Sequence, residues 1–218
     1  HDGGDFMLKR QNYYDMMRVQ MKDIVLDLLE HILKMTTDYL AYLDEPSEDK
    51  KALLLQQETV IDQSEEKIND MILELITLQP LAKEDVKELF GIGRIAGRLE
   101  RVGDQIINLL TISEEEDVDV LKPVANRFMT YEYDMMEWLL EGIANENIDL
   151  LKKVIDHDKH VNQLNIGTYE SLVHSVEKQQ DITGGNLKTI IAGRFLERLG
   201  DYLVTIAKTF IDILENRL

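Results

Sequence analysis

The 218-residue chain contains no cysteine, only three prolines and one tryptophan, and few aromatic residues. Without cysteine the chain has no disulfide framework and no thiolate metal site. The scarcity of proline and aromatics, with abundant Leu, Ile, Glu, Asp and Lys, favours helices over the β-branched and aromatic mixture of sheet proteins. We therefore expect an all-α protein, and the lack of cysteine suits a reducing cytoplasm.

Long apolar runs and basic clusters are also missing. No stretch approaches the ~18 consecutive apolar residues that a membrane span requires, so we expect no membrane insertion of this segment. The chain has 24 Lys and Arg against 42 Asp and Glu, a net charge of −18, which would repel a phosphate backbone and excludes nucleic acid as a partner. Such an acidic surface suits solubility, divalent cations or basic partner proteins.

One hexapeptide occurs twice. Residues 99–104 read LERVGD, and 97 positions later residues 196–201 read LERLGD. This period is too long for a solenoid repeat of ~20–50 residues and predicts two tandem helical units. We place them at residues 7–113 and 114–218, joined by the acidic segment Glu114–Asp117. Because the chain begins with His1 rather than methionine, and no signal peptide is evident, residues 1–6 are set apart as a linker outside the repeats.

Six segments of about 25–35 residues with helical periodicity lie between sparse helix breakers. The breakers are Asp44–Ser47, Gln79-Pro80, Ser113–Asp119 before Pro123, Asn145–Asn147 and Asp181–Asn186. Short connections between long amphipathic helices favour antiparallel neighbours, which predicts two tandem three-helix bundles of six long antiparallel helices. Ser113 with Glu116 fits a capping box well, and Ser47 with Lys50 fits it poorly.

Apolar stripes and methionines mark the expected core of these bundles. They are Leu54, Ile61, Ile68, Met71, Leu75 and Leu78 in the second segment; Ile92, Ile95, Leu99, Val102, Ile106 and Leu109 in the third; Ala192, Leu196, Leu199, Leu203, Ile206 and Phe210 in the sixth; and Met16, Met17, Met21, Met35, Met129, Met135 and Met136.

Each hexapeptide places two acids four residues apart on one helix face: Glu100 with Asp104, and Glu197 with Asp201. Like charges at this spacing destabilise a helix, and a bound cation would remove the repulsion. Small residues in the same rows, such as Gly103 and Gly200, would let another helix approach closely. The alternative is that arginines already neutralise the acids, either Arg98, Arg101 and Arg198 or a basic residue of a neighbouring helix.

The second helical segment carries a further acidic row, Glu58, Asp62 and Glu65. Carboxylates that converge from two helices suit iron, zinc, magnesium or manganese. The corresponding row of the second unit reads Asp158, Asn162 and Asn165, so two of its three acids are amides. His157 and His160 flank Asp158 at a spacing that could let both face one ion, although histidines on a polar helix surface are common.

Two three-helix units, each with ERxGD in its third helix within the pattern ExxxDxxxN, resemble the PhoU family. The pattern reads Glu100, Asp104, Asn108 in the first unit and Glu197, Asp201, Thr205 in the second. The resemblance implies metal clusters at these carboxylates, with the first unit the better candidate because of the changes at Asn162, Asn165 and Thr205. It also implies a non-enzymatic cytoplasmic regulator that couples phosphate transporter components to a sensor histidine kinase.

Three further hypotheses stay open at this stage. PhoU-like units also occur as cytosolic parts of sodium/phosphate cotransporters, and an upstream multi-span region would favour that role. A carboxylate-bridged metalloenzyme would need Glu-x-x-His pairs on two helices, which we do not find at matching positions. Exposed seams on such bundles often pair, so a homodimer is among the expected assemblies.

Overall fold

Six long α-helices and one short 3₁₀ helix form the part of the chain that the computed structural model describes, residues 2–78, 80–178 and 183–217. The order is α1 (Asp2–Asp44), α2 (Glu48–Leu78), α3 (Lys83–Ile112), η1 (Glu115–Asp117), α4 (Val118–Ala144), α5 (Ile148–Glu177) and α6 (Gly184–Glu215). The predicted all-α class with six helices is confirmed. The predicted breaks at Gln79 and at residues 181–182 lie outside the described residues.

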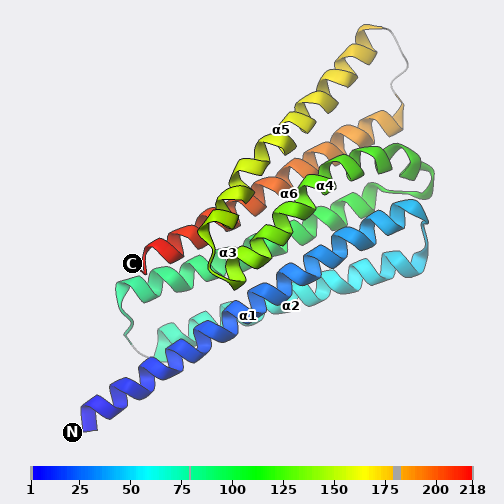
Figure 1. Ribbon diagram of the computed structural model, residues 1–218. Helices are drawn as coiled ribbons and strands as arrows, with labels where there is room; N and C mark the ends of the chain where they lie inside the picture. The colour runs from blue at the N-terminus through cyan, green and yellow to red at the C-terminus, as the bar shows by residue number, and fades with distance from the viewer. Residues whose placement is uncertain (1, 79, 179–182, 218) are drawn as a thin grey trace.

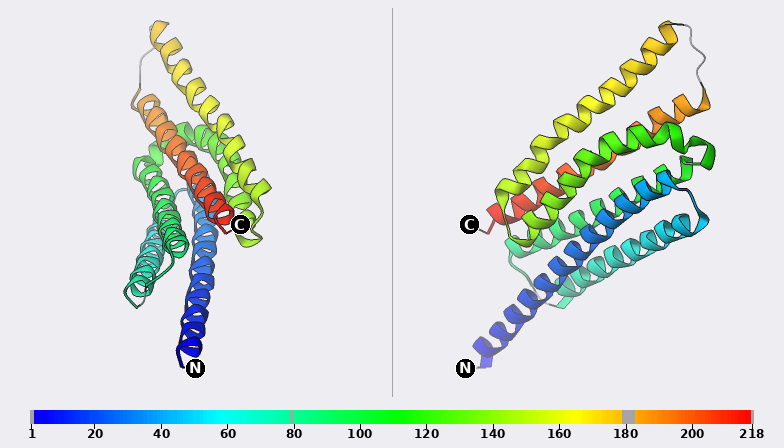
Figure 2. Two further views of the ribbon diagram at one scale, coloured as in Figure 1. Left: turned by 90° about the vertical axis from the view of Figure 1, so that its left-hand side faces the viewer. Right: turned by 45° about the vertical axis from the view of Figure 1, so that its right-hand side comes forward.

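Consecutive helices run in opposite directions, as the short connections require (Figure 1). Helices α1, α2 and α3 pack on one another, and so do α4, α5 and α6. The two sets meet through α1 against α4 and through α3 against α6, which is the most extensive helix pair of the fold. Helices α2 and α5 therefore lie on the outside, on either side of a central group of four (Figures 1 and 2).

The predicted core stripes of α3 and α6 are buried along their whole length, and both belong to one continuous apolar cluster that spans the two repeats. Leu99 and Leu196, the first residues of the two hexapeptides, are completely buried. Six of the seven methionines named in the sequence analysis are also buried. The prediction was wrong for Met16 and Leu78, which are exposed because they lie on faces of α1 and α2 that no neighbour covers.

The helix ends follow side-chain capping at most of the predicted breaks. Ser47 Oγ accepts a hydrogen bond from the Lys50 amide at 3.2 Å, and Asn147 Oδ1 accepts from the amides of Asp149 and Leu150. The capping box predicted at Ser113 is wrong. Its hydroxyl is buried, donates to the Leu109 carbonyl and pairs with the Tyr39 hydroxyl at 2.8 Å, so it closes α3 instead of opening α4.

Helix α5 diverges from α6 toward its C-terminal end (Figures 1 and 2). Its three buried residues, Leu151, Val154 and Val161, all lie in its first half. The second half exposes apolar side chains at helical spacing, Ile166, Tyr169, Val173 and Val176. Among the described residues, no helix has a stretch that is both long and apolar enough to cross a membrane.

Candidate metal centre

Helices α2 and α3 approach each other closely along the row of small residues beside the α3 core stripe. A methyl group added to Gly93 would lie 3.1 Å from Ile72 Cδ1, and one added to Gly103 would lie 3.3 Å from Ile61 Cδ1. These contacts are tight, so glycine at both positions permits the approach. The predicted close packing beside Glu100 is present, and it places that acid at a helix–helix seam.

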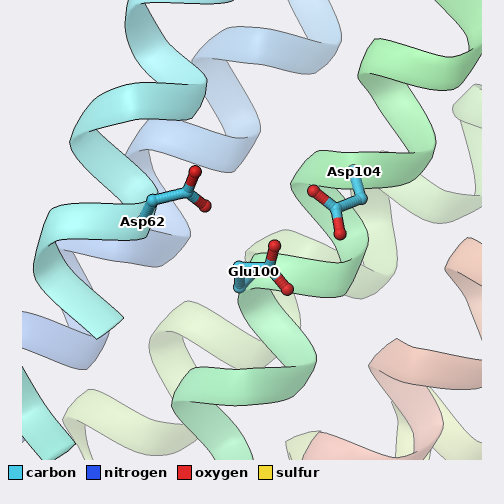
Figure 3. A group of neighbouring side chains, drawn as sticks. All are labelled: Asp62, Glu100 and Asp104. Atoms are coloured by element: carbon cyan, nitrogen blue, oxygen red, sulfur yellow. The ribbon is translucent and has the colours of Figure 1, made fainter. Parts of the chain in front are cut away.

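Three carboxylates meet across this seam. Asp62 projects from α2 toward Glu100 and Asp104 on α3, whose carboxyl groups lie close together one turn apart (Figure 3). Each of the three offers an oxygen within 4.8 Å of the others. Glu58 and Glu65 lie one turn to either side of Asp62 on α2, and burial, followed by the charges of Asp62 and Asp104, raises the pKa of both. The oxygen-only donor set fits a hard or borderline cation such as iron, manganese or magnesium.

The electrostatics of this cluster show that negative charge is not fully compensated. Burial, a hydrogen bond that protonated Glu100 donates to the Asp104 carboxylate, and the charges of Asp104 and Glu65 raise the pKa of Glu100 to about 8. Burial first, and neighbouring carboxylates second, also raise the pKa of Glu58, Asp62 and Glu65. A bound cation would remove this repulsion and restore the ionised forms.

The arginine alternative has limited support in the geometry. Arg101 Nε lies 4.0 Å from Glu100 Oε2, and its side chain is 60 % exposed, so solvent screens this pair strongly. The Arg98 guanidinium instead lies over the Tyr202 ring of α6, 5.7 Å from its centroid, and its Nε is buried without a hydrogen-bond partner. Arg98 therefore contributes to the α3–α6 interface rather than to the acidic cluster.

The second repeat arranges its predicted acids differently. Asn165 donates a hydrogen bond of 2.6 Å to Glu197 Oε2, and Asn162 donates one of 3.4 Å to Asp158 Oδ2. Asp201 is exposed. Within the described part of the chain, Glu197 and Asp201 belong to no three-acid group as compact as that of the first repeat. The side-chain amides of Asn162 and Asn165 thus form hydrogen bonds with the acids of α5 and α6, where the first repeat has carboxylates that repel one another.

Sequence reasoning missed Glu132 on α4. Its side chain is completely buried, neither carboxylate oxygen has a hydrogen-bond partner among the described residues, and it lies near Asp158. Burial, together with the charge of Asp158, raises the pKa of Glu132 well above its usual range. A signal was available: Glu132 is the one acid within the apolar stripe Phe128, Met129, Met135, Met136 and Leu139.

His157 and His160 pack against aromatic side chains of α4 and are only half-exposed. The His160 ring stacks on Tyr131 with centroids 5.3 Å apart, and the His157 ring meets Trp138 edge-on at 4.8 Å. Burial and the neighbouring His160 lower the pKa of His157. This aromatic packing explains both histidines without a metal ion.

A second compact acidic group, Glu114, Glu116 and Asp117, lies in the connection between the repeats. Lys188 of α6 makes an ion pair with Asp117 and approaches Glu114 to 3.9 Å. This lysine ties the inter-repeat connection to α6, so a structural role accounts for the group.

The model of the PhoU domain family matches the chain twice, over residues 25–113 and 126–210. Among curated proteins, the chain is similar to the phosphate-specific transport system accessory protein PhoU homologs of Clostridium acetobutylicum (21% identity, 84% of this chain and 86% of the relative) and Borreliella burgdorferi (24%, 86% and 88%). Among solved structures it is similar to the phosphate transport system regulatory protein PhoU from Streptococcus pneumoniae and to PhoU from Pseudomonas aeruginosa. The TM-scores are 0.76 and 0.71 at 17% and 20% identity, over 92% and 93% of this chain and 96% and 99% of those chains.

Proposed function

The chain belongs to the PhoU family, and from this premise we propose that it is a non-enzymatic cytoplasmic regulator of phosphate uptake and phosphate-starvation signalling. In this role it would act as an adaptor between the components of a phosphate transporter and a sensor histidine kinase, at the cytosolic face of the membrane. The observation that carries the proposal is the match of the family model to both repeats, which cover most of the chain.

The relatives support the phosphate connection, because the curated homologs are named as accessory proteins of a phosphate-specific transport system. The architecture supports the adaptor role. A central group of four helices leaves long faces of α2 and α5 open to partners, and helix faces are a common means of protein recognition.

We further propose that the first repeat binds iron, zinc, manganese or magnesium through Glu58, Asp62, Glu65, Glu100 and Asp104. The metal would neutralise the cluster and hold α2 against α3. Ile61 and Ile72 already pack against the glycines of α3, so the ion would reinforce an existing seam rather than create one. In this role the ion would fix the position of the outer helix α2, whose exposed face is available to partner proteins.

The regulatory proposal is tested in the organism that encodes the chain. Deletion of the gene should turn on a phosphate-starvation reporter in phosphate-rich medium, and the wild-type gene supplied in trans should silence it. Cross-linking followed by identification of a phosphate-transporter ATPase and a sensor kinase would support the adaptor role. A reporter that stays silent in the deletion strain would contradict it, and a reading frame that continues upstream into a multi-span region would favour the sodium/phosphate cotransporter instead.

A further inference from the structure

We propose that the joint between the two repeats binds a short-chain aliphatic carboxylate. The acid group of this ligand takes the place of Glu146 between Lys22 and Arg217, and its tail fills an apolar cavity behind them. The site uses none of the carboxylates at the seam between α2 and α3. The inference goes beyond the regulatory and metal-binding proposals and rests on neither.

A cavity of about 130 Å³ lies between α1, α3, α6 and the C-terminal end of α4. The apolar residues that border it are buried, and they are Val25, Ile92, Ile143, Phe210 and Ile213. Because they come from both repeats, the cavity belongs to the joint between them. An apolar cavity of about 150 Å³ stays dry and takes up benzene. A tail of about five carbons would therefore fit here and make the packing contacts that the cavity lacks.

A network of ion pairs lies at the mouth of this cavity. Arg217, which follows α6, donates hydrogen bonds of 2.5 Å to Glu88 of α3 and of 2.7 Å to Glu146 in the turn between α4 and α5. From α1, Arg18 donates to Glu88 at 3.4 Å. Lys22, one turn further along α1, donates to Glu146 at 3.4 Å. All five residues line the cavity, so the network connects four parts of the chain at the point where a ligand would enter.

A wider cleft connects the mouth of the cavity to solvent. The cleft has a volume of about 760 Å³, lies between the first turns of α3 and the last turns of α6, and shares Arg18, Glu88 and Arg217 with the cavity. Figure 1 shows the C-terminal end of α6 beside the beginning of α3 at one end of the molecule. A ligand in the cleft therefore meets the ion pairs first, and its tail enters the cavity where they separate.

Glu146 is the member of the network that the ligand would displace. Its backbone φ is 52°, and no other non-glycine residue in the described part of the chain has a positive φ. Glycine is usual in this conformation after a helix end, because a side chain raises its energy. Glu146 therefore holds its carboxylate against Lys22 and Arg217 at a cost in backbone strain. Its side chain is 43 % exposed, so it becomes hydrated at little cost when another acid replaces it.

The charges at the mouth select an acid as the head group of the ligand. Lys22 and Arg217 have more N–H donors than their hydrogen bonds to Glu88 and Glu146 use. The planar guanidinium of an arginine matches a carboxylate with two parallel hydrogen bonds. A ligand carboxylate in the place of Glu146 keeps the charge of the network balanced, and its tail adds apolar burial that Glu146 does not supply. A neutral head group would leave the two cations without their acid.

The test follows the isoleucine methyl signals by NMR, in protein labelled at isoleucine Cδ1, while sodium hexanoate is added. Saturable shifts are expected at Ile92, Ile143 and Ile213, which border the cavity, and none at Ile61 of α2. Hexanol has the tail without the charge, and inorganic phosphate has charge without the tail. Each should bind at least about tenfold more weakly than hexanoate, because each makes only one of the two kinds of contact.

Two substitutions test the head group. Glu146→Gln removes the competing acid and should tighten hexanoate binding by about tenfold. Glu141→Gln, the same chemical change at an exposed position of α4, should leave binding unchanged. Arg217→Met should weaken binding by about tenfold, in protein that circular dichroism shows to be folded.

The proposal is overturned if hexanoate gives no saturable shift at the three cavity isoleucines, or if hexanol or phosphate binds as tightly as hexanoate. It is also overturned if Glu146→Gln binds hexanoate no more tightly than Glu141→Gln does. These measurements need neither a metal ion nor the starvation reporter, so their failure is distinct from failure of the regulatory and metal-binding proposals.

Discussion

Replacement of Glu100 by glutamine should make the metal-free protein more stable at alkaline pH. The folded state raises the pKa of Glu100 from an ordinary value of 4.5 to about 8. A carboxyl group with a raised folded pKa keeps its proton in the folded state after the unfolded chain has released it. The free energy of unfolding therefore falls as pH rises from about 4.5 to about 8, and does not recover above it.

The magnitude follows from the shift. One pKa unit corresponds to about 1.4 kcal/mol, and we reduce the full value by about half because the Glu100 side chain is 21 % exposed and solvent screens its neighbours. Glu100→Gln, which keeps the shape and removes the charge, should then raise the free energy of unfolding by roughly 2 kcal/mol at pH 9 and by close to nothing at pH 4.

Urea denaturation followed by circular dichroism, with chelator present and from pH 4 to pH 9, measures this difference directly. With a saturating divalent cation at about 100 times its dissociation constant, wild type should regain about 2.7 kcal/mol, whereas Glu100→Gln should gain much less. Arg101→Gln is the control for the ion-pair alternative. A stability difference between Glu100→Gln and wild type that is the same at pH 4 and pH 9, or a loss of stability in both variants at pH 9, would show that arginine already compensates Glu100.

Three simpler predictions concern stability and are measured by thermal and urea denaturation. Gly167→Ala should stabilise the protein by roughly 0.5–1 kcal/mol, because Gly167 lies inside α5 with open space where a methyl group would go; an unchanged or lower midpoint would contradict this. Leu196→Ala should lower the free energy of unfolding by about 2–5 kcal/mol, because it leaves a cavity in a fully buried stripe. A loss under about 1 kcal/mol would mean that neighbouring side chains move in to fill the cavity. Arg217→Met should lower the free energy of unfolding by about 1–3 kcal/mol, since Arg217 donates hydrogen bonds to the buried Glu88 and to the exposed Glu146. Lys152→Met, at an exposed site, should change it little, and equal effects of the two substitutions would refute the role of the Arg217 hydrogen bonds.

The sequence predicted the fold well because its signals are local and repeated. The spacing of Leu99, Leu196 and their apolar neighbours indicates a helix face, and the doubled hexapeptide indicates two copies of that face. The sequence did not indicate which helices of one repeat pack on the other. Helices α3 and α6 have apolar residues on more than one face, and periodicity alone does not show which neighbour each face contacts. The prediction of two bundles therefore says nothing of the shared core that α3 and α6 create.

The candidate site was predictable only where its residues share a motif. Glu100 and Asp104 belong to the hexapeptide, and Asp62 lies in a periodic acidic row, so both signals pointed to the seam that the structure shows. Glu132 has no motif and lies in the first helix of its repeat. Its proximity to Asp158 arises from the packing of α4 on α5 and α6, which is a tertiary property that spacing along one helix does not encode.

The placement of the acids determines which part of the molecule an ion would act on. Glu100 and Asp104 face α2, while the core stripe of the same helix packs into the interior beside α6. Loss or gain of a metal ion at Glu100 and Asp104 would therefore change how tightly α2 packs on α3. The α3–α6 pair would stay in place, because buried apolar residues rather than charges stabilise it. Helix α2 carries Asp62 and packs on α3, so α2 is the outer helix whose position should respond to metal removal. Hydrogen exchange of the α2 amides with and without chelator would measure that response, and equal exchange under the two conditions would contradict it.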